Sequence, residues 1–118
     1  MKPFEVVEAE SPSDERYIAL TLRGYLDAHT VNDFETFMDR SIERGTLRYV
    51  MDISDLSYIS SAGIGAIMGL TQRLRRAEGE VVLLRPSEKV FKVLDKLGFT
   101  KIFRMAYSRE EAERLFRE

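Results

Sequence analysis

The chain contains no cysteine and no tryptophan, and it has a single histidine, His29, among its 118 residues. Without cysteine there can be no disulfide, no thiolate nucleophile and no cysteine-based zinc site, and this composition fits a reducing compartment. One histidine leaves little choice of a side chain for general-base catalysis near neutral pH. The absences therefore count against most enzyme classes before any motif is considered.

Long apolar runs and blocks of one charge are also missing. No apolar run approaches the ~18 residues that cross a membrane, and the stretch 1–15 has acids where a signal peptide would have its apolar core. The 18 basic and 20 acidic residues give a net charge of −2, with no basic block that would favour nucleic acid. We expect one cytoplasmic domain over residues 1–118, with neither a membrane nor a nucleic acid as partner.

Strand and helix patterns alternate along the chain. After an opening hairpin, broken by the turn SPSD at 11–14, each apolar strand pattern is followed by a loop and a helix pattern. This order predicts an α/β fold with a mainly parallel sheet and right-handed crossovers. The predicted elements are strands at 4–9, 16–23, 47–53, 80–85 and 101–104, a loop marked by Gly24 and Asp27, and helices starting at Thr30, Ser60 or Ser61, Ser87 and Ser108, of which the first three end at Gly45, Gly79 and Gly98.

The uncharged stretch SYISSAGIGAIMG at 57–69 invites comparison with catalytic loops. A hydrolase elbow needs G-x-S-x-G followed later by histidine, but 59–63 reads ISSAG and His29 precedes the serines. A P-loop needs a lysine after its last glycine, and a dinucleotide loop needs a third glycine one place before Gly69. None of these patterns is complete, so we do not expect an enzyme.

Two aspartates near the end of a predicted strand are candidates for a phosphate acceptor or for metal ligands. Asp52 stands where response-regulator receivers place their phosphorylated aspartate, but the acidic pair and the lysine that those domains require are missing. Asp52 and Asp55 are two carboxylates without a third ligand, which favours turn capping over a metal site. We therefore expect no metal and no cofactor.

The remaining interpretation of the stretch is a serine at a helix start. Ser60 or Ser61 would be the N-cap, and on spacing alone capping accounts for the serine. The free amides and the dipole of a helix start also stabilise an anion. A phosphate there would add about −1.5 to −2 charges to a neutral patch. Such a change could switch off a partner-binding surface.

Three segments together resemble the anti-sigma factor antagonists, the bacterial branch of the STAS domain family. They are GYLDAHT at 24–30, DISDLSYISSAGIGAIMG at 52–69 and KVFKVLDKLGFTKIF at 89–103, and the likeness spans about 4–118. Members of this family typically show G-x-L-D after the second strand and D-S-[ST]-G-[LI]-G at the opening of a helix. The resemblance implies a STAS fold: a mixed, mainly parallel sheet with an amino-terminal hairpin and about four helices packed against it.

The resemblance also implies a partner-switching cycle. An unphosphorylated antagonist binds an anti-sigma factor, which is itself an ATP-dependent serine kinase, and so frees the sigma factor. Phosphorylation of the antagonist breaks the complex, and a phosphatase resets it. Carried onto this chain, the phosphate acceptor falls on Ser61, the family's aspartate falls on Ser60, and the family's second Ser/Thr falls on Ala62. Ser60 is the alternative acceptor.

The same resemblance implies a docking surface around the acceptor, on a protein that we expect to be a monomer until it meets its partner. Because Ser60 replaces the family's aspartate, a non-phosphorylated STAS scaffold or ligand-sensing module is the alternative function. A small α/β enzyme is a third option that lacks its base, elbow and metal cluster. The predicted docking residues are Gly24, Asp27, His29, Thr30, Ser60, Ser61, Ala62, Gly63, Ile64 and Gly65.

Overall fold

A computed structural model describes residues 3–9 and 17–118 of the chain, so the predicted turn at 11–14 and Arg16 lie outside the described residues. Strands and helices alternate over most of this length, as the sequence predicts. The elements are β1 (Phe4–Ala9), β2 (Ile18–Leu26), α1 (Val31–Glu43), β3 (Arg48–Asp52), β4 (Leu56–Ile59), α2 (Ser61–Arg76), β5 (Glu80–Leu84), α3 (Glu88–Lys96), the 3-10 helix η1 (Phe99–Lys101), β6 (Arg104–Ala106) and α4 (Arg109–Phe116).

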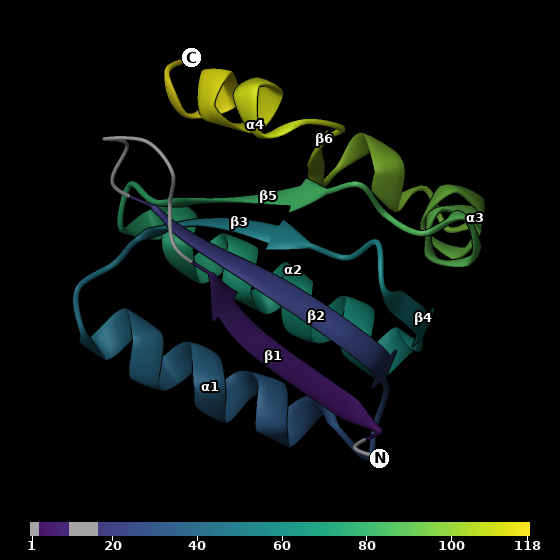
Figure 1. Ribbon diagram of the computed structural model, residues 1–118. Coiled ribbons are helices and arrows are strands. Elements are labelled where there is room, and N and C mark those ends of the chain that lie inside the picture. The colour runs from purple at the N-terminus through teal and green to yellow at the C-terminus, as the bar shows by residue number, and fades with distance from the viewer. Residues whose placement is uncertain (1–2, 10–16) are drawn as a thin grey trace.

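The described strands form one mixed sheet in the order β1-β2-β3-β5-β6. β1 is antiparallel to β2, whereas the pairs β2–β3, β3–β5 and β5–β6 are parallel. β4 lies off this path and pairs in parallel with the last residues of β2. Helices α1 and α2 lie on one side of the sheet and α4 lies on the other (Figure 1). The predicted α/β fold with a mainly parallel sheet is confirmed.

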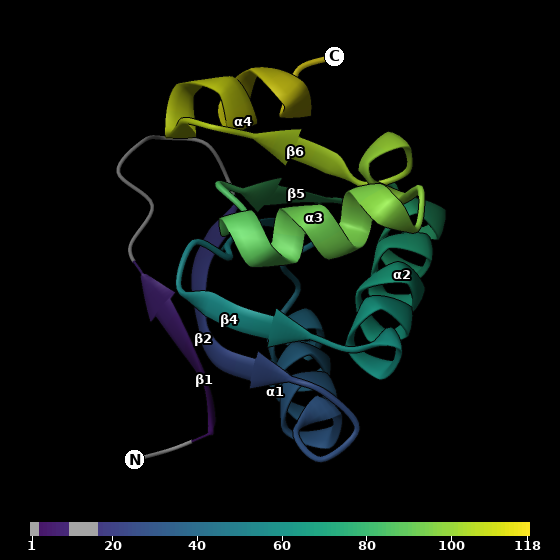
Figure 2. The ribbon, with the colours of Figure 1, turned by 90° about the vertical axis from the view of Figure 1, so that its right-hand side faces the viewer.

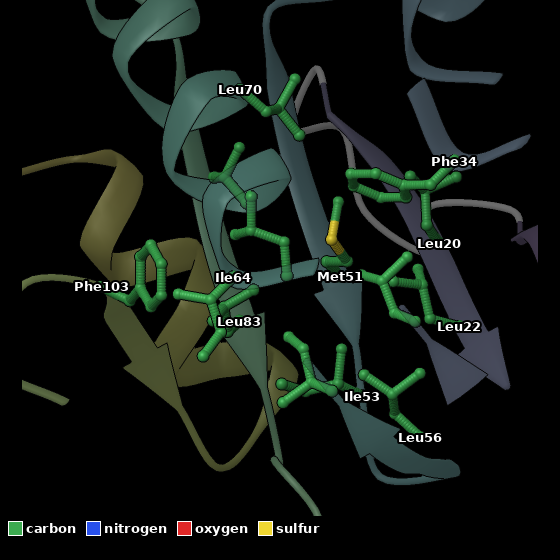
Figure 3. Packing of buried hydrophobic residues seen from close by; sticks show 14 of the residues in the cluster. Leu20, Leu22, Phe34, Met51, Ile53, Leu56, Ile64, Leu70, Leu83 and Phe103 are labelled. Carbon is green, nitrogen blue, oxygen red and sulfur yellow. The ribbon is translucent and has the colours of Figure 1, made fainter. Parts of the chain in front are cut away.

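Alternation along each strand produces two apolar cores, one on each face of the sheet. In β3, Met51 joins the larger core and Val50 joins the smaller one. Figure 3 shows the larger core, where Met51 from the sheet lies near Leu70 of α2 and Phe34 of α1. The smaller core buries the inner side of α4, including Phe116, against the other face. Each fully buried leucine or methionine contributes about 1.5–3 kcal/mol.

Strand β4 is absent from the sequence prediction, which makes the predicted element order one strand short. Its buried residues, Leu56 and Ile59, are three apart, and the two between them are exposed. This is not the alternation by which a strand is recognised. β2 also runs to Leu26 rather than ending before Gly24, which lies within the strand at φ +92. A side chain there would meet the Pro3 carbonyl, so glycine is required.

The predicted strand at 101–104 is misplaced. Gly98 adopts a left-handed conformation and the chain then turns through η1, so that the strand begins at Arg104. Within this turn Ile102 is exposed and Phe103 is buried, and this change of side from one residue to the next resembles the pattern of a strand. The end of α2 also differs from expectation, because Glu78 takes the left-handed position at φ 65, whereas Gly79 is needed for its close approach to Leu47.

Candidate functional site at the start of helix α2

The junction between β4 and α2 brings the two adjacent serines into different environments. Ser60 is the N-cap of α2, and its Oγ accepts a hydrogen bond from the Gly63 amide at 3.4 Å. The Ser60 amide donates to the carbonyl of Leu26 at 3.0 Å. Ser60 is half-buried, and both its hydroxyl oxygen and its amide are hydrogen-bonded. The sequence allows either of the two serines as the N-cap, and in the structure the N-cap is Ser60.

Ser61 is the first residue of α2, and it is exposed. Among the described residues, no hydrogen bond engages its hydroxyl. The first turn of α2 carries no acidic side chain, whereas α1, α3 and α4 each carry at least one there. The Ser61 hydroxyl is therefore accessible to another protein, in a turn without local negative charge.

Gly63 presses the start of α2 against the end of β2. A Cβ at this position would lie 2.6 Å from the Leu26 carbonyl oxygen and 2.9 Å from Cγ1 of Ile59. Gly65, in contrast, has no neighbour within 4 Å of its Cβ position. Glycine at position 63 thus serves close packing between a helix and a strand end, which fixes Ser61 relative to the loop that follows β2.

The loop after β2 is closed by its own side chains. Oδ1 of Asp27 accepts hydrogen bonds from the amides of His29 at 2.9 Å and Thr30 at 3.2 Å. The Thr30 hydroxyl accepts from the Asp27 amide at 3.0 Å and donates to the Tyr25 carbonyl at 2.7 Å. Thr30 is the N-cap of α1 by position, but its side chain makes no capping bond, contrary to the prediction. His29 remains exposed at the tip of the loop.

The predicted docking residues divide by exposure. His29, Ser61 and Gly65 are exposed, and Asp27, Ser60 and Ala62 are half-buried, as is Gly24 within β2. Thr30 and Ile64 are buried at 4% and 3% exposure, and Gly63 is buried too. Ile64 points into the larger core in Figure 3. These three residues can act on a partner only by positioning the exposed ones.

Two aromatic residues beside the site were not singled out from the sequence. Tyr25 is 51% exposed and Tyr58 is 49% exposed, and their ring centroids lie 6.5 Å apart in an edge-to-face arrangement. They are partners across the pairing of β2 with β4. The sequence prediction lacks strand β4, and only the pairing of β4 with β2 brings Tyr58 beside Tyr25.

Asp52 has partners that account for its position. Its Oδ1 accepts from the amide of Ser54 at 2.9 Å and from the Ser54 hydroxyl at 2.7 Å, and its Oδ2 lies 3.2 Å from Arg85. Asp55 pairs with Arg23 at 3.5 Å. Within residues 3–9 and 17–118, no group of His, Asp and Glu side chains could hold a metal ion. Over the same ranges, no helix is long and apolar enough to cross a bilayer.

A family model for the STAS domain matches residues 8–112 of the chain. The Bordetella bronchiseptica protein BtrV, named provisionally as an anti-sigma factor antagonist, is 33% identical to the chain over 81% of its length and 83% of BtrV. An anti-sigma F factor antagonist of Lysinibacillus sphaericus is 29% identical over 69% of this chain and 70% of its own.

Solved structures extend the likeness to the whole fold. The anti-sigma factor antagonist SpoIIAA, solved in its unphosphorylated form, superposes with a TM-score of 0.72 at 26% identity and covers 95% of each chain. The Bacillus cell fate determinant SpoIIAA, solved in its phosphorylated form, superposes with a TM-score of 0.66 at 25% identity, over 95% of this chain and 98% of that one. The chain is thus similar to a protein that has been solved both with and without phosphate.

Proposed function

The chain belongs to the STAS domain family, and from this premise we propose that it is an anti-sigma factor antagonist switched by phosphorylation of Ser61. In its unphosphorylated form it binds an anti-sigma factor serine kinase and so releases a sigma factor. The kinase transfers a phosphoryl group from ATP to Ser61, the complex dissociates, and a serine phosphatase restores the binding form. The protein itself catalyses no step, and it acts in the cytoplasm, where its partners work.

The observation that carries this proposal is the exposed Ser61 hydroxyl in the first turn of α2. Ser60, the alternative acceptor, is half-buried, and its oxygen is engaged by the Gly63 amide. A kinase acting on Ser60 would have to break that cap, which is worth about 1 kcal/mol. Ser61 needs no such rearrangement. The solved phosphorylated form of a similar chain supports a phosphate cycle on this fold.

Phosphate on Ser61 would change the surface rather than the fold. The amino-terminal end of a helix stabilises negative charge by about 0.3–1 kcal/mol when it is exposed. No acidic side chain in the first turn of α2 would oppose the phosphate. About −1.5 to −2 charges would nevertheless appear on a helix start that carries no acidic side chain, which disfavours a partner matched to that uncharged turn. Loss of binding without unfolding is the expected result.

The replacement of the family's aspartate by Ser60 favours one alternative, a STAS scaffold that is never phosphorylated. Ser60 keeps the capping role that an aspartate would have, so the replacement leaves the helix start intact. A large homotypic particle in size-exclusion chromatography, without an associated kinase, would support that alternative. A monomer that binds an anti-sigma factor would exclude it.

A reconstituted release assay tests the proposed function. Each serine-kinase anti-sigma factor of the source organism is purified in complex with its sigma factor and ADP, and the chain is added. We expect free sigma factor with the wild type and at least about tenfold less release with Ser61→Asp, because that change puts a permanent charge on the docking surface. Ser108→Asp, which adds the same charge at the start of α4, is the matched control. Failure of the wild type to bind any of these complexes would contradict the proposal.

A further inference from the structure

The two faces of the sheet are covered unequally. α1 and α2 pack along one face, whereas the other face is covered by α4 over the positions of Tyr17, Ala19 and Val50. Because side chains alternate along a strand, Thr21, Arg23 and Tyr25 of β2 continue that second face toward the carboxyl end of the strand. In the part of the chain that the structure describes, none of these three belongs to the core beneath α4, and Arg23 and Tyr25 are exposed.

An aromatic pair lies at the carboxyl end of this face. Tyr25 and Tyr58 expose about half of their surface while their rings touch edge to face. Arg23, the nearest charged residue along β2, is paired with Glu5 at 3.4 Å and with Asp55 at 3.5 Å. Tyrosine is one of the residue types enriched in the energetic centres of protein interfaces, with tryptophan and arginine.

The aromatic pair and the start of α2 form one rigid unit. Tyr25 pairs with Tyr58 and Leu26 pairs with Ile59, so the strand ends lie side by side, as Figure 2 shows for β2 and β4. The Ser60 amide then bonds to the Leu26 carbonyl at 3.0 Å, and Gly63 packs on the same residue. The position of the tyrosines relative to Ser61 is therefore fixed by backbone contacts and not by flexible side chains.

The tyrosine pair and Ser61 lie close together on the scale of a protein interface. Ser61 is three positions after Tyr58 in the sequence, which bounds their Cα separation at about 10 Å. A standard interface covers about 800 Å² on each partner, a patch roughly 30 Å across. The separation of Tyr58 from Ser61 is therefore smaller than the width of one such interface.

We propose that Tyr25 and Tyr58 form the anchor on which the anti-sigma factor kinase docks, an inference that rests on the proposed function. The occupant is the face of that kinase which presents an apolar side chain to the two rings. The two rings bind by apolar contact, so their contribution to the affinity persists in high salt. The tyrosines provide affinity, and Ser61 provides the switch within the same footprint.

Binding of the purified anti-sigma factor kinase with ADP, measured by calorimetry, tests this anchor. We expect Tyr25→Ala and Tyr58→Ala each to raise Kd at least about tenfold, as truncation of a hot-spot tyrosine does. The same ratios of variant Kd to wild-type Kd should hold at 0.5 M salt, where the Debye length is on the order of 4 Å. Tyr25→Phe keeps the ring and should stay within about twofold of wild type.

Tyr107→Ala is the matched control, because Tyr107 is 55% exposed and follows β6, which β3 and β5 separate from β2. It should leave Kd unchanged. Hydrogen exchange of the wild-type complex, which needs no variant, should show new protection over 24–30 and 56–63. If the wild type binds the kinase and the double alanine variant binds equally well, the anchor is refuted and the proposed function stands. If the wild type binds no such kinase, the proposed function fails and the anchor fails with it.

Discussion

Helices α2 and α4 both begin at a serine that accepts a hydrogen bond from the amide three residues on. Ser60 accepts from Gly63 at 3.4 Å, and Ser108 accepts from Glu111 at 3.1 Å. The surroundings of these two caps differ. The Glu111 carboxylate also accepts a hydrogen bond from the amide of Tyr107, the residue before the N-cap, at 3.4 Å, so that a side chain of α4 closes its own helix start. At the equivalent position α2 has glycine, because the Leu26 carbonyl leaves no room for a side chain.

The residue that follows each N-cap is also more enclosed in α4 than in α2. Arg109 in α4 donates to the Tyr17 hydroxyl at 3.0 Å and is half-buried. Ser61 in α2 is exposed, and within the described part of the chain its hydroxyl has no partner. One helix start is closed by its own side chains, and the other is held by backbone packing that leaves a hydroxyl free. Both helices have a serine N-cap, so the residues around the N-cap determine which helix start leaves a hydroxyl accessible.

The largest effect on stability that the comparison predicts is that of Gly63→Ala. The added Cβ would force the Leu26 carbonyl to move, and overpacking of this kind costs about 1–3 kcal/mol, offset by the ~1 kcal/mol by which alanine favours a helix. We expect a net loss of up to about 2 kcal/mol in the free energy of unfolding, measured in urea. Gly65→Ala, two residues on in open space, is the control and should gain about 1 kcal/mol or less. Equal effects of the two changes would contradict the packing argument.

A smaller effect is expected from removing the caps. Ser108→Ala should cost about 1 kcal/mol, the usual value of a serine cap. Ser60→Ala should cost less, because its bond to the Gly63 amide is longer than the bond that Ser108 accepts. Urea unfolding of both variants measures the difference. If Ser60→Ala lost more free energy of unfolding than Ser108→Ala, the expected order would be wrong, and Ser60 would stabilise the fold by more than its capping bond.

Most of the fold follows from local patterns in the sequence. Helix starts at Ser87 and Ser108 are predicted from capping residues, and both serines accept the expected bond from the residue three places on. The buried strands β3 and β5 are predicted from their apolar runs to within two residues of their observed ends. These features depend on neighbours in the chain, which is the information that a sequence pattern contains.

The parts that escaped prediction depend on contacts between distant segments. β4 forms because Leu56 and Ile59 are buried beside the end of β2, which no alternation in its four residues reveals. Thr30 has the position of a cap, but the Tyr25 carbonyl draws its hydroxyl away from the helix. The contact of Ser60 with Leu26, the residue before the loop, depends on the same pairing of β2 with β4. Sequence patterns found the serine, and tertiary contacts determine what lies next to it.

Phosphosite mapping by mass spectrometry, after incubation with the anti-sigma factor kinase and ATP, tests the role of Ser61 most directly. We expect one phosphate on the wild type, located on Ser61, because this hydroxyl is exposed and unengaged whereas that of Ser60 caps the helix. Ser60→Ala should still accept the phosphate, and Ser61→Ala should accept none. A phosphate located on Ser60, or one gained by Ser61→Ala, would contradict the assignment.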